Sequence, residues 1–388
     1  MNIGIVTRKN ESQFGGDLVA LKSIGEGFNE LGFRVFYGPT SEAVIKSDFI
    51  FLSNSCTDLR REASYLSSRN KRWGIIGFHE DFSKYYGDSI GFATYVQLMV
   101  DNQDIEGEYA TLSKLLSSPK IYTFLNQKIP PTAFLNYNVL KDAKVCVANS
   151  NTEKGTMLKD CPSANVIVAP LAPGITEGDV AYSDEFLRLT GLDKGSYVLQ
   201  IGRLEIRKNQ LASILAMRDI DKPLVFIATK GYQSFYDNIV FKTIKKYRKY
   251  PTYIISEEHA SYTEGNLKII QMPNGQRLSN SCILSAYQNA GLHLHPAFWE
   301  TPGYTYLEAS RLGIPSVASS WGGFKDYCTL EGNSEDLNGL IKYVSPYDIT
   351  GIESAIRELF GLKFEPIQHP IFTRTGKDMA SEILQHIQ

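Results

Sequence analysis

Short apolar runs alternate with amphipathic stretches along the chain. The first run, residues 2–6, is followed by a polar loop that contains Gly15 and Gly16, and then by apolar residues at helical spacing as far as Leu31. Val35 begins the next apolar run. A strand, a loop, a helix and a strand in this order form a βαβ unit, which predicts a parallel sheet.

The same alternation continues through both halves of the chain. Strands are predicted at 48–52, 73–78, 144–148, 165–169, 196–201, 223–228, 267–270, 292–295 and 315–319. Residues 82–140 show no clear pattern, and a Pro- and Gly-containing stretch after Pro170 separates the halves. We therefore predict an α/β protein with an N-terminal domain over 1–180, a C-terminal domain over 181–370 and a final helix over 371–388 that packs back on the N-terminal domain.

Composition narrows the class of protein. The chain has 388 residues, of which 43% are hydrophobic and 21% charged, as is typical of a soluble globular protein. A formal net charge of −2 offers no basic excess, so nucleic acid is not an expected partner. Five dispersed cysteines favour a reducing compartment, and no apolar run approaches the ~20 residues of a membrane span. We predict a cytoplasmic protein.

Two basic clusters could bring the protein to the inner face of the membrane. The clusters are Lys242, Lys245, Lys246, Arg248 and Lys249, and Arg69, Lys71 and Arg72. Each could be a solvated helix face, or it could contact anionic lipid.

Candidate ligand-binding residues follow several strands. Gly15 and Gly16 lie where backbone N–H groups before a helix can approach an anion, with a plain tight turn as the alternative. His79 follows a strand of the first half, at the edge where open α/β sheets bind ligands. Arg203 and Lys208 follow the first strand of the second half, where two fixed cations suit a diphosphate and a solvated charged turn is the alternative.

The most informative stretch follows the strand at 292–295. It turns through Pro302 and Gly303 and enters a helix, with Glu300 before the turn and Glu308 inside the helix. Two carboxylates beside open backbone amides could hold a polyhydroxylated ligand, or they could form a general acid/base pair.

No metal site is predicted. Asp219 and Asp221 have the D-x-D spacing of metal-dependent sugar transfer, but they precede an apolar strand instead of following one. His293 and His295 alternate on a strand and lack an evident third ligand.

Four features stand in an order that resembles a known enzyme family. They are Gly15-Gly16, His79, Arg203 with Lys208, and Glu300 with Glu308 at E-x7-E spacing. Together they resemble the retaining glycosyltransferases of family 4, most strongly over residues 196–330. The resemblance implies the GT-B fold, in which two Rossmann-like domains face each other across a cleft.

The resemblance also implies roles for the charged residues. Arg203 and Lys208 would bind the donor diphosphate and stabilise the leaving nucleotide without a metal ion. Glu300 would hold hydroxyls of the donor sugar, Glu308 would hold the ribose, and His79 would touch the sugar from the N-terminal domain.

Backbone groups would complete the donor site. Amides around Gly303, Tyr304 and Thr305 would lie against the sugar and phosphate, and Gly15 and Gly16 would approach from the other domain. One departure bears on the donor: Thr301 and Pro302 stand where the family commonly has Gly and Phe. The identity of the donor is therefore left open between UDP- and GDP-linked sugars.

The resemblance predicts a metal-independent retaining hexosyltransferase that uses a nucleotide sugar as co-substrate and needs no cofactor. Its acceptor would be a glycan or lipid-linked glycan of surface polysaccharide biosynthesis, such as O-antigen, capsule or lipopolysaccharide. The alternatives are a sugar-nucleotide epimerase and a catalytically silent subunit that binds sugar nucleotide or glycan. The intact Arg203, Lys208 and Glu300 argue against the silent subunit.

Overall fold

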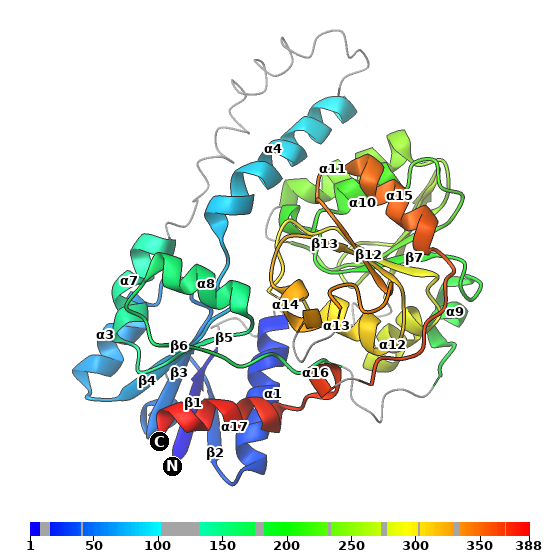
Figure 1. The fold of residues 1–388 in the computed structure, drawn as a ribbon. Helices are drawn as coiled ribbons and strands as arrows, with labels where there is room; N and C mark the ends of the chain where they lie inside the picture. The colour runs from blue at the N-terminus through cyan, green and yellow to red at the C-terminus, as the bar shows by residue number, and fades with distance from the viewer. Residues whose placement is uncertain are drawn as a thin grey trace.

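The computed structural model describes residues 1–7, 16–39, 42–101, 132–174, 182–231, 234–272, 278–301, 303–329, 334–368 and 370–388. They form two α/β lobes, one built mainly from each half of the chain (Figure 1). The predicted pair of Rossmann-like domains is confirmed. The predicted boundary at residue 180 lies within 175–181, outside the described residues.

A six-stranded parallel sheet forms the centre of the N-terminal lobe, in the order β2-β1-β3-β4-β5-β6. Its strands are β1 (Asn2–Val6), β2 (Arg34–Gly38), β3 (Phe49–Ser53), β4 (Arg72–Ile76), β5 (Cys146–Ala148) and β6 (Val166–Val168). Its helices are α1 (Gly16–Glu30), α2 (Glu42–Ile45), α3 (Arg60–Ser68), α7 (Thr132–Asp142) and α8 (Asn151–Asp160). The central strands are continuous apolar runs because both faces of the sheet are covered, and Phe49 and Phe51 are fully buried.

An eight-stranded sheet forms the centre of the C-terminal lobe, in the order β10-β11-β9-β8-β7-β12-β13-β14, and it is parallel except for the pairing of β10 with β11. Its strands are β7 (Val198–Ile201), β8 (Leu224–Ile227), β9 (Thr252–Ser256), β10 (Tyr262–Glu264), β11 (Leu267–Gln271), β12 (Leu292–His295), β13 (Ser316–Ser319) and β14 (Ile341–Val344). Its helices are α9 (Glu185–Thr190), the 3-10 helix η3 (Ile206–Lys208), α10 (Gln210–Ala216), α11 (Ser234–Tyr247), α12 (Asn280–Gln288), α13 (Tyr304–Arg311), α14 (Phe324–Thr329) and α15 (Ile349–Leu359). Strands β9, β10 and β14 lie outside the strands predicted from the sequence.

Helix α4 (Phe82–Asp101) connects the two lobes (Figure 1). It begins at the end of β4, but Ala93 and Val96 are buried in the apolar core formed with α10, α11 and β7. The Lys246 ammonium of α11 donates a hydrogen bond to the carbonyl of Met99. The second half of α4 therefore packs as part of the C-terminal lobe, although it lies within the range predicted for the N-terminal domain.

The short helix α16 (Pro370–Thr373) leads into α17 (Gly376–Ile387), which lies against α1 in the N-terminal lobe, close to both chain ends (Figure 1). Ile383 and Ile387 are buried in the core that α1 also faces. The two helices approach closely at Gly27 and Gly376, because a Cβ on Gly27 would overlap the backbone of Gly376. The chain thus crosses between the lobes and returns at its C-terminus.

The first basic cluster has partners within the protein. Lys242 lies 2.7 Å from Asp101 at the end of α4, Lys245 pairs with Glu264, and Lys249 pairs with Asp219. The Arg248 side chain is buried, with its residue only 3% exposed, so it cannot reach a lipid surface, and that part of the membrane prediction is wrong. Much of this cluster holds α4 and adjoining loops in place.

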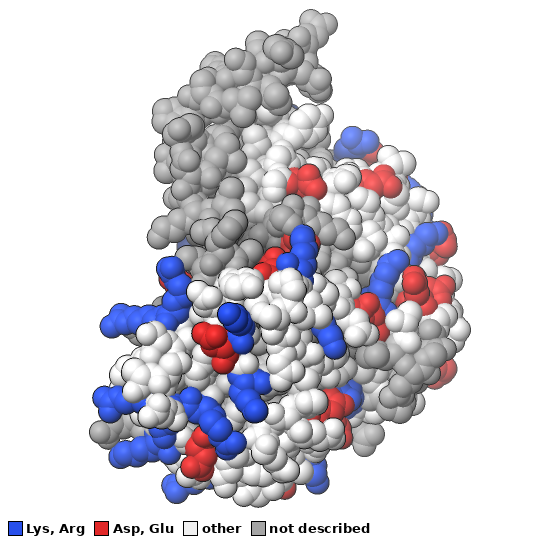
Figure 2. Space-filling view, turned by 60° about the vertical axis from the view of Figure 1, so that its left-hand side comes forward, with Lys and Arg blue, Asp and Glu red and all other residues white. Residues whose placement is uncertain are grey.

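The second basic cluster is also in contact with the protein. The Lys71 ammonium donates to the carbonyl of Ser47, and the Arg72 guanidinium donates to the carbonyl of Ile387. On the face drawn in Figure 2, Lys and Arg side chains gather toward the lower left, where fewer Asp and Glu side chains lie among them. No helix in the described ranges is long and apolar enough to cross a membrane. Peripheral membrane contact stays a prediction.

Candidate functional site

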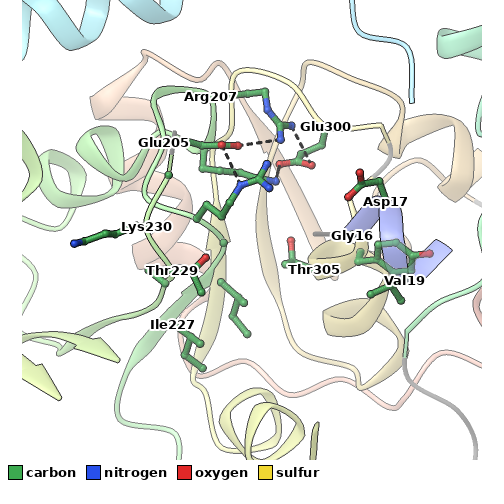
Figure 3. Close-up of a pocket in the computed structure, with 18 of the residues that line it drawn as sticks. Gly16, Asp17, Val19, Glu205, Arg207, Ile227, Thr229, Lys230, Glu300 and Thr305 are labelled. Atoms are coloured by element: carbon green, nitrogen blue, oxygen red, sulfur yellow. Dashed lines mark hydrogen bonds and ion pairs between the residues drawn. The ribbon is translucent and has the colours of Figure 1, made fainter. Parts of the chain in front are cut away.

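A cleft of about 830 Å³ lies between the two lobes, at the carboxyl ends of their strands. Glu80 follows β4, Arg203 follows β7, and Glu300 follows β12. Figure 3 shows Gly16, Asp17 and Val19 of α1 on one side of this space and residues of the C-terminal lobe on the other. Ligands of open α/β folds bind at such strand ends, and a volume of this size is within the range of small-molecule sites.

Most of the predicted site residues line this cleft. They are Gly16, Arg203, Lys208, Glu300, Gly303, Tyr304, Thr305 and Glu308. Gly15 lies outside the described residues. The side chains predicted from distant parts of the sequence are therefore brought together in one place.

His79 is the exception, because its side chain is fully buried inside the N-terminal lobe. Its Nδ1 lies 2.9 Å from the Ser55 hydroxyl, and its Nε2 lies 2.8 Å from Asp160. Phe78, the residue before it, has a left-handed backbone with φ of 53° and lines the cleft together with Glu80. The imidazole predicted to touch a sugar is thus turned into the protein, and its neighbour Glu80 takes the place at the cleft.

The loop that carries Glu300 is fixed from several sides. The Asn209 amide donates to the carbonyl of Pro296, and the backbone N–H of Phe298 donates to the carbonyl of Arg207. The backbone N–H of Gly323 donates to the carbonyl of Glu300 over 2.9 Å. These bonds connect the loop after β12 to η3 and to the loop after β13, so the position of Glu300 is set by its surroundings.

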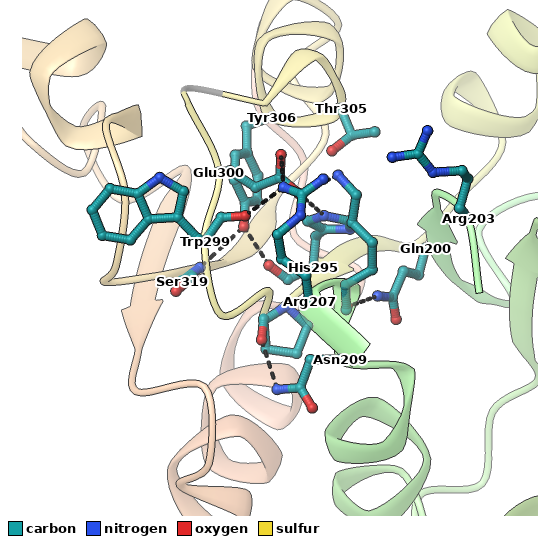
Figure 4. Close-up of polar contacts among 12 residues, drawn as sticks. Gln200, Arg203, Arg207, Asn209, His295, Trp299, Glu300, Thr305, Tyr306 and Ser319 are labelled. Atoms are coloured by element: carbon teal, nitrogen blue, oxygen red, sulfur yellow. Dashed lines mark hydrogen bonds and ion pairs between the residues drawn. The ribbon is translucent and has the colours of Figure 1, made fainter. Parts of the chain in front are cut away.

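Glu300 lies among three nitrogen-bearing side chains (Figure 4). Its Oε1 accepts a hydrogen bond from the Lys208 ammonium and lies 3.0 Å from Nε2 of His295, and its Oε2 lies 3.6 Å from the Arg207 guanidinium. Burial alone would raise the pKa of Glu300, but the charges of Lys208 and Arg207 outweigh burial and hold it well below its ordinary value. Glu300 is therefore an anion at neutral pH and cannot serve as a proton donor.

A second carboxylate, Glu205, pairs with the arginines of the same loop. It lies 3.2 Å from Arg203 Nε and 3.0 Å from the Arg207 guanidinium. Burial opposes ionisation of Glu205, but the charges of Arg207 and Arg203 lower its pKa below the ordinary value. Burial also lowers the pKa of Lys208, against the attraction of Glu300. Arg203, Arg207 and Lys208 are thus held in place by carboxylates next to the open cleft.

The N-terminus of α13 faces the same space. Gly303 precedes the helix with φ of 96°, a conformation that favours glycine, and in the described part of the chain no side-chain hydrogen bond caps the helix there. The Tyr304 and Thr305 hydroxyl oxygens are buried, and neither has a hydrogen-bond partner among the described residues. Burial raises the pKa of Tyr304, so its hydroxyl stays protonated and can donate. Helix amides and two such hydroxyls suit an anionic or hydroxyl-bearing ligand.

The lobes approach each other closely around α13 at two glycines. A Cβ on Gly16 of α1 would lie 3.1 Å from the Tyr304 ring, and one on Gly174 of the interdomain segment would lie 2.7 Å from Glu308 Oε1. Both glycines therefore permit a close approach that larger residues would prevent. Glu308 lies beside the connection between the lobes, one helix turn from Tyr304.

Several residues of the cleft are not among those predicted from the sequence. Arg207 and Glu205 lie in the loop from which the sequence analysis selects only Arg203 and Lys208, and Glu80 directly follows His79. The alternation of acidic and basic residues through 203–208 is the one sequence signal that could have indicated them. Among the described residues, no group of three or more His, Cys, Asp or Glu side chains could hold a metal ion.

The two facing Rossmann-like domains with a cleft between them define the GT-B fold. A sucrose-phosphate synthase from Thermosynechococcus elongatus is similar in structure, with a TM-score of 0.59 and 12% identity over 99% of this chain and 94% of that one. A trehalose-6-phosphate synthase has a TM-score of 0.56 and 11% identity over 100% and 96% of the two chains.

A third similar structure, an α,α-trehalose-phosphate synthase from Burkholderia xenovorans in complex with glucose-6-phosphate, has a TM-score of 0.51 and 12% identity over 88% of this chain and 73% of that one. No protein-family model matches the sequence, and comparison with curated protein sequences gives no match. At these identities the likeness shows the fold, so the predicted GT-B fold is confirmed and membership of family 4 stays a prediction.

Proposed function

We propose that the protein is a retaining glycosyltransferase that moves a sugar, as a hexosyl group, from a nucleotide-diphosphate donor. One observation carries the proposal: Arg203, Lys208 and the uncapped N-terminus of α13 face one cleft together with Glu300 and Glu308. Two cations and a helix N-terminus can bind a diphosphate and stabilise the charge that develops as it leaves. This arrangement needs no metal ion, and the nucleotide sugar is its only co-substrate.

The carboxylates have a positioning role in this proposal. An ionised Glu300 accepts hydrogen bonds from donor-sugar hydroxyls, and Glu308 does the same for the ribose. Because the pKa of Glu300 lies well below its ordinary value, the pair does not act as general acid and base. An epimerase or a silent subunit would also bind the nucleotide diphosphate, so transfer of the sugar to an acceptor is the result that separates a transferase from both.

The proposed acceptor is an uncharged glycan, free or lipid-linked, as in surface polysaccharide biosynthesis. The described N-terminal residues that line the cleft include two acids, Asp17 and Glu80, and no Lys or Arg. The aromatic residues Tyr85 and Tyr86 line the same wall. Acids disfavour a phosphorylated acceptor, whereas aromatic rings and polar groups suit sugars. Because one structure of the same fold was solved with glucose-6-phosphate, sugar phosphates form the second acceptor class to test.

Donor binding and turnover test the proposal. Calorimetry with UDP, GDP and ADP identifies the nucleotide, and release of that nucleotide from its sugar derivative measures turnover with and without acceptor. Lys208→Ala should lower turnover by about 100-fold or more, as loss of a charge-stabilising group does. Glu300→Ala should lower turnover too, whereas Lys249→Ala, which removes an exposed lysine outside the cleft, should not change it.

Three results would count against the proposal. They are the absence of binding to all three nucleotides, equal effects of Lys208→Ala and Lys249→Ala, and a product with inverted anomeric configuration. The acceptor arms compare oligosaccharides, lipid-linked oligosaccharides and glucose-6-phosphate.

A further inference from the structure

We propose that Arg207 is a positioning residue of the transfer site, which holds Glu300 in place when the donor occupies Lys208 and fixes the acceptor wall of the cleft to the donor side. This inference rests on the proposed function. Arg207 lies one residue before Lys208, in η3, and its side chain is 21% exposed at the edge of the cleft.

The guanidinium of Arg207 lies near four oxygen atoms from three parts of the chain. It donates to the carbonyl of Trp299 over 2.9 Å and to Glu205 over 3.0 Å, and it lies 3.6 Å from both Glu300 and Glu80. Only a planar group with several N–H donors can serve so many acceptors at once. A lysine has one nitrogen and could not span this set.

The two oxygens of Glu300 have different partners, and the difference gives Arg207 its role. Oε1 is shared by Lys208 and His295, whereas Oε2 faces Arg207. A diphosphate bound to Lys208 would replace Glu300 as the partner of the Lys208 ammonium. Glu300, whose side chain is only 7% exposed, would then keep His295 on one oxygen and Arg207 on the other, and would stay ionised and aimed at the sugar.

Arg207 also belongs to a closed ring of contacts across the cleft. Glu80, at the end of β4, accepts a hydrogen bond from the Tyr85 hydroxyl. The Tyr85 ring stacks on Trp299 with centroids 5.9 Å apart, and the carbonyl of Trp299 accepts from Arg207. Tyr85 lies near the start of α4 and lines the cleft, in the wall proposed to receive the acceptor. The ring therefore sets the distance from that wall to Glu300.

The test compares Arg207→Lys and Arg207→Met with matched controls, Arg188→Lys and Arg188→Met. Arg188 lies on α9, outside the cleft, with a side chain 70% exposed. Calorimetry with UDP, GDP and ADP gives the affinity for nucleotide, and nucleotide release from UDP-glucose, GDP-mannose and ADP-glucose gives kcat. Turnover is measured against pH for the donor that the wild type uses.

For the Arg207 variants we expect kcat to fall by about tenfold or more, as misplacement by a fraction of an ångström does, with the nucleotide Kd within about threefold of wild type. The acid limb of the pH–rate profile of Arg207→Met should move to higher pH, because Glu300 would lose one of the two cations that favour its anion. The Arg188 variants should match the wild type in all three measurements.

Other results separate the failure of this inference from that of the proposed function. If the wild type turns over a donor and Arg207→Lys keeps the wild-type kcat, Arg207 is not a positioning residue. The same conclusion follows if activity falls only in proportion to the folded fraction. Should Arg207→Met not fold, Arg207→Lys, which keeps the charge, decides the matter. Both proposals are overturned if the wild type binds none of the three nucleotides and turns over none of the three nucleotide sugars.

Discussion

Gly322→Ala should abolish most activity although it removes no side chain of the cleft. Gly322 lies in the loop after β13, with φ of 99°, and a Cβ there would overlap the carbonyl oxygen of Glu300 and lie 2.9 Å from its nitrogen. The added Cβ would lie about 1 Å closer to this oxygen than an ordinary carbon–oxygen contact of roughly 3.3 Å allows. Both partners are backbone, and Gly323 is hydrogen-bonded to the same carbonyl, so the loop carrying Glu300 must move.

A displacement of this size should lower turnover by about 100-fold, because catalytic geometry tolerates little misplacement. The left-handed backbone adds roughly 1–2 kcal/mol of strain for alanine, and the overlap adds about 1–3 kcal/mol. Gly339→Ala is the matched control: its φ is 85°, but no atom of the described residues lies within 4 Å of an added Cβ. It should show the strain alone, with a lower free energy of unfolding and unchanged turnover per folded molecule.

The assays are urea denaturation, nucleoside diphosphate affinity and nucleotide release at saturating donor. Gly322→Ala should weaken nucleotide affinity less than it lowers turnover, because Arg203 belongs to another loop. If Gly322→Ala and Gly339→Ala lose the same amount of turnover, backbone strain explains the effect and the argument from Glu300 is wrong. Turnover by Gly322→Ala within about threefold of wild type would also refute it, since a shift near 1 Å should cost far more.

Three further predictions concern the scaffold. Burial raises the pKa of Glu153 to about 7 from its ordinary 4.5, so between these pH values the unfolded chain binds fewer protons than the folded protein. The free energy of unfolding should therefore fall by up to about 3 kcal/mol as the pH rises through this window. Urea titrations at several pH values check this, and Glu153→Gln should lack the pH dependence. Gly27→Ala should destabilise the protein by about 1–3 kcal/mol through overlap with Gly376, whereas Gly155→Ala, in α8 with open space around it, should stabilise by about 0.5–1 kcal/mol in the same thermal unfolding assay. Val96→Ala should cost roughly 2 kcal/mol and speed hydrogen exchange in α4, and unchanged exchange would show that α4 is not held by the C-terminal lobe.

Sequence periodicity predicts the strands in which consecutive residues are buried. The apolar runs of β1, β3 and β8 are covered on both faces, so their hydrophobicity alone reveals them. Helix α4 is not predicted from the sequence, and the apolar residues of its second half, including Ala93 and Val96, are buried by the other lobe. A sequence pattern shows that a face is apolar, but it does not show which distant element covers it.

The same distinction applies to the site residues. Residues fixed by a local motif, such as Glu300 and Glu308, reach the cleft as predicted. His79 does not, because the backbone turns at Phe78 and the buried Ser55 and Asp160 bind both ring nitrogens. Chain order placed this histidine at the correct strand end, but the direction of its side chain depends on partners far away in the sequence.

The charges of the cleft explain why carboxylates are so close to a proposed diphosphate site. The connected network contains three cations, Arg203, Arg207 and Lys208, and three carboxylates, Glu80, Glu205 and Glu300. Buried cations without partners would be costly, so the carboxylates allow the cations to be fixed before the donor arrives. A diphosphate then needs only to exchange places with one carboxylate oxygen at Lys208 or Arg203. Because Glu300 remains bound to His295 and Arg207 after such an exchange, the group that stabilises the empty cleft can become the group that positions the sugar.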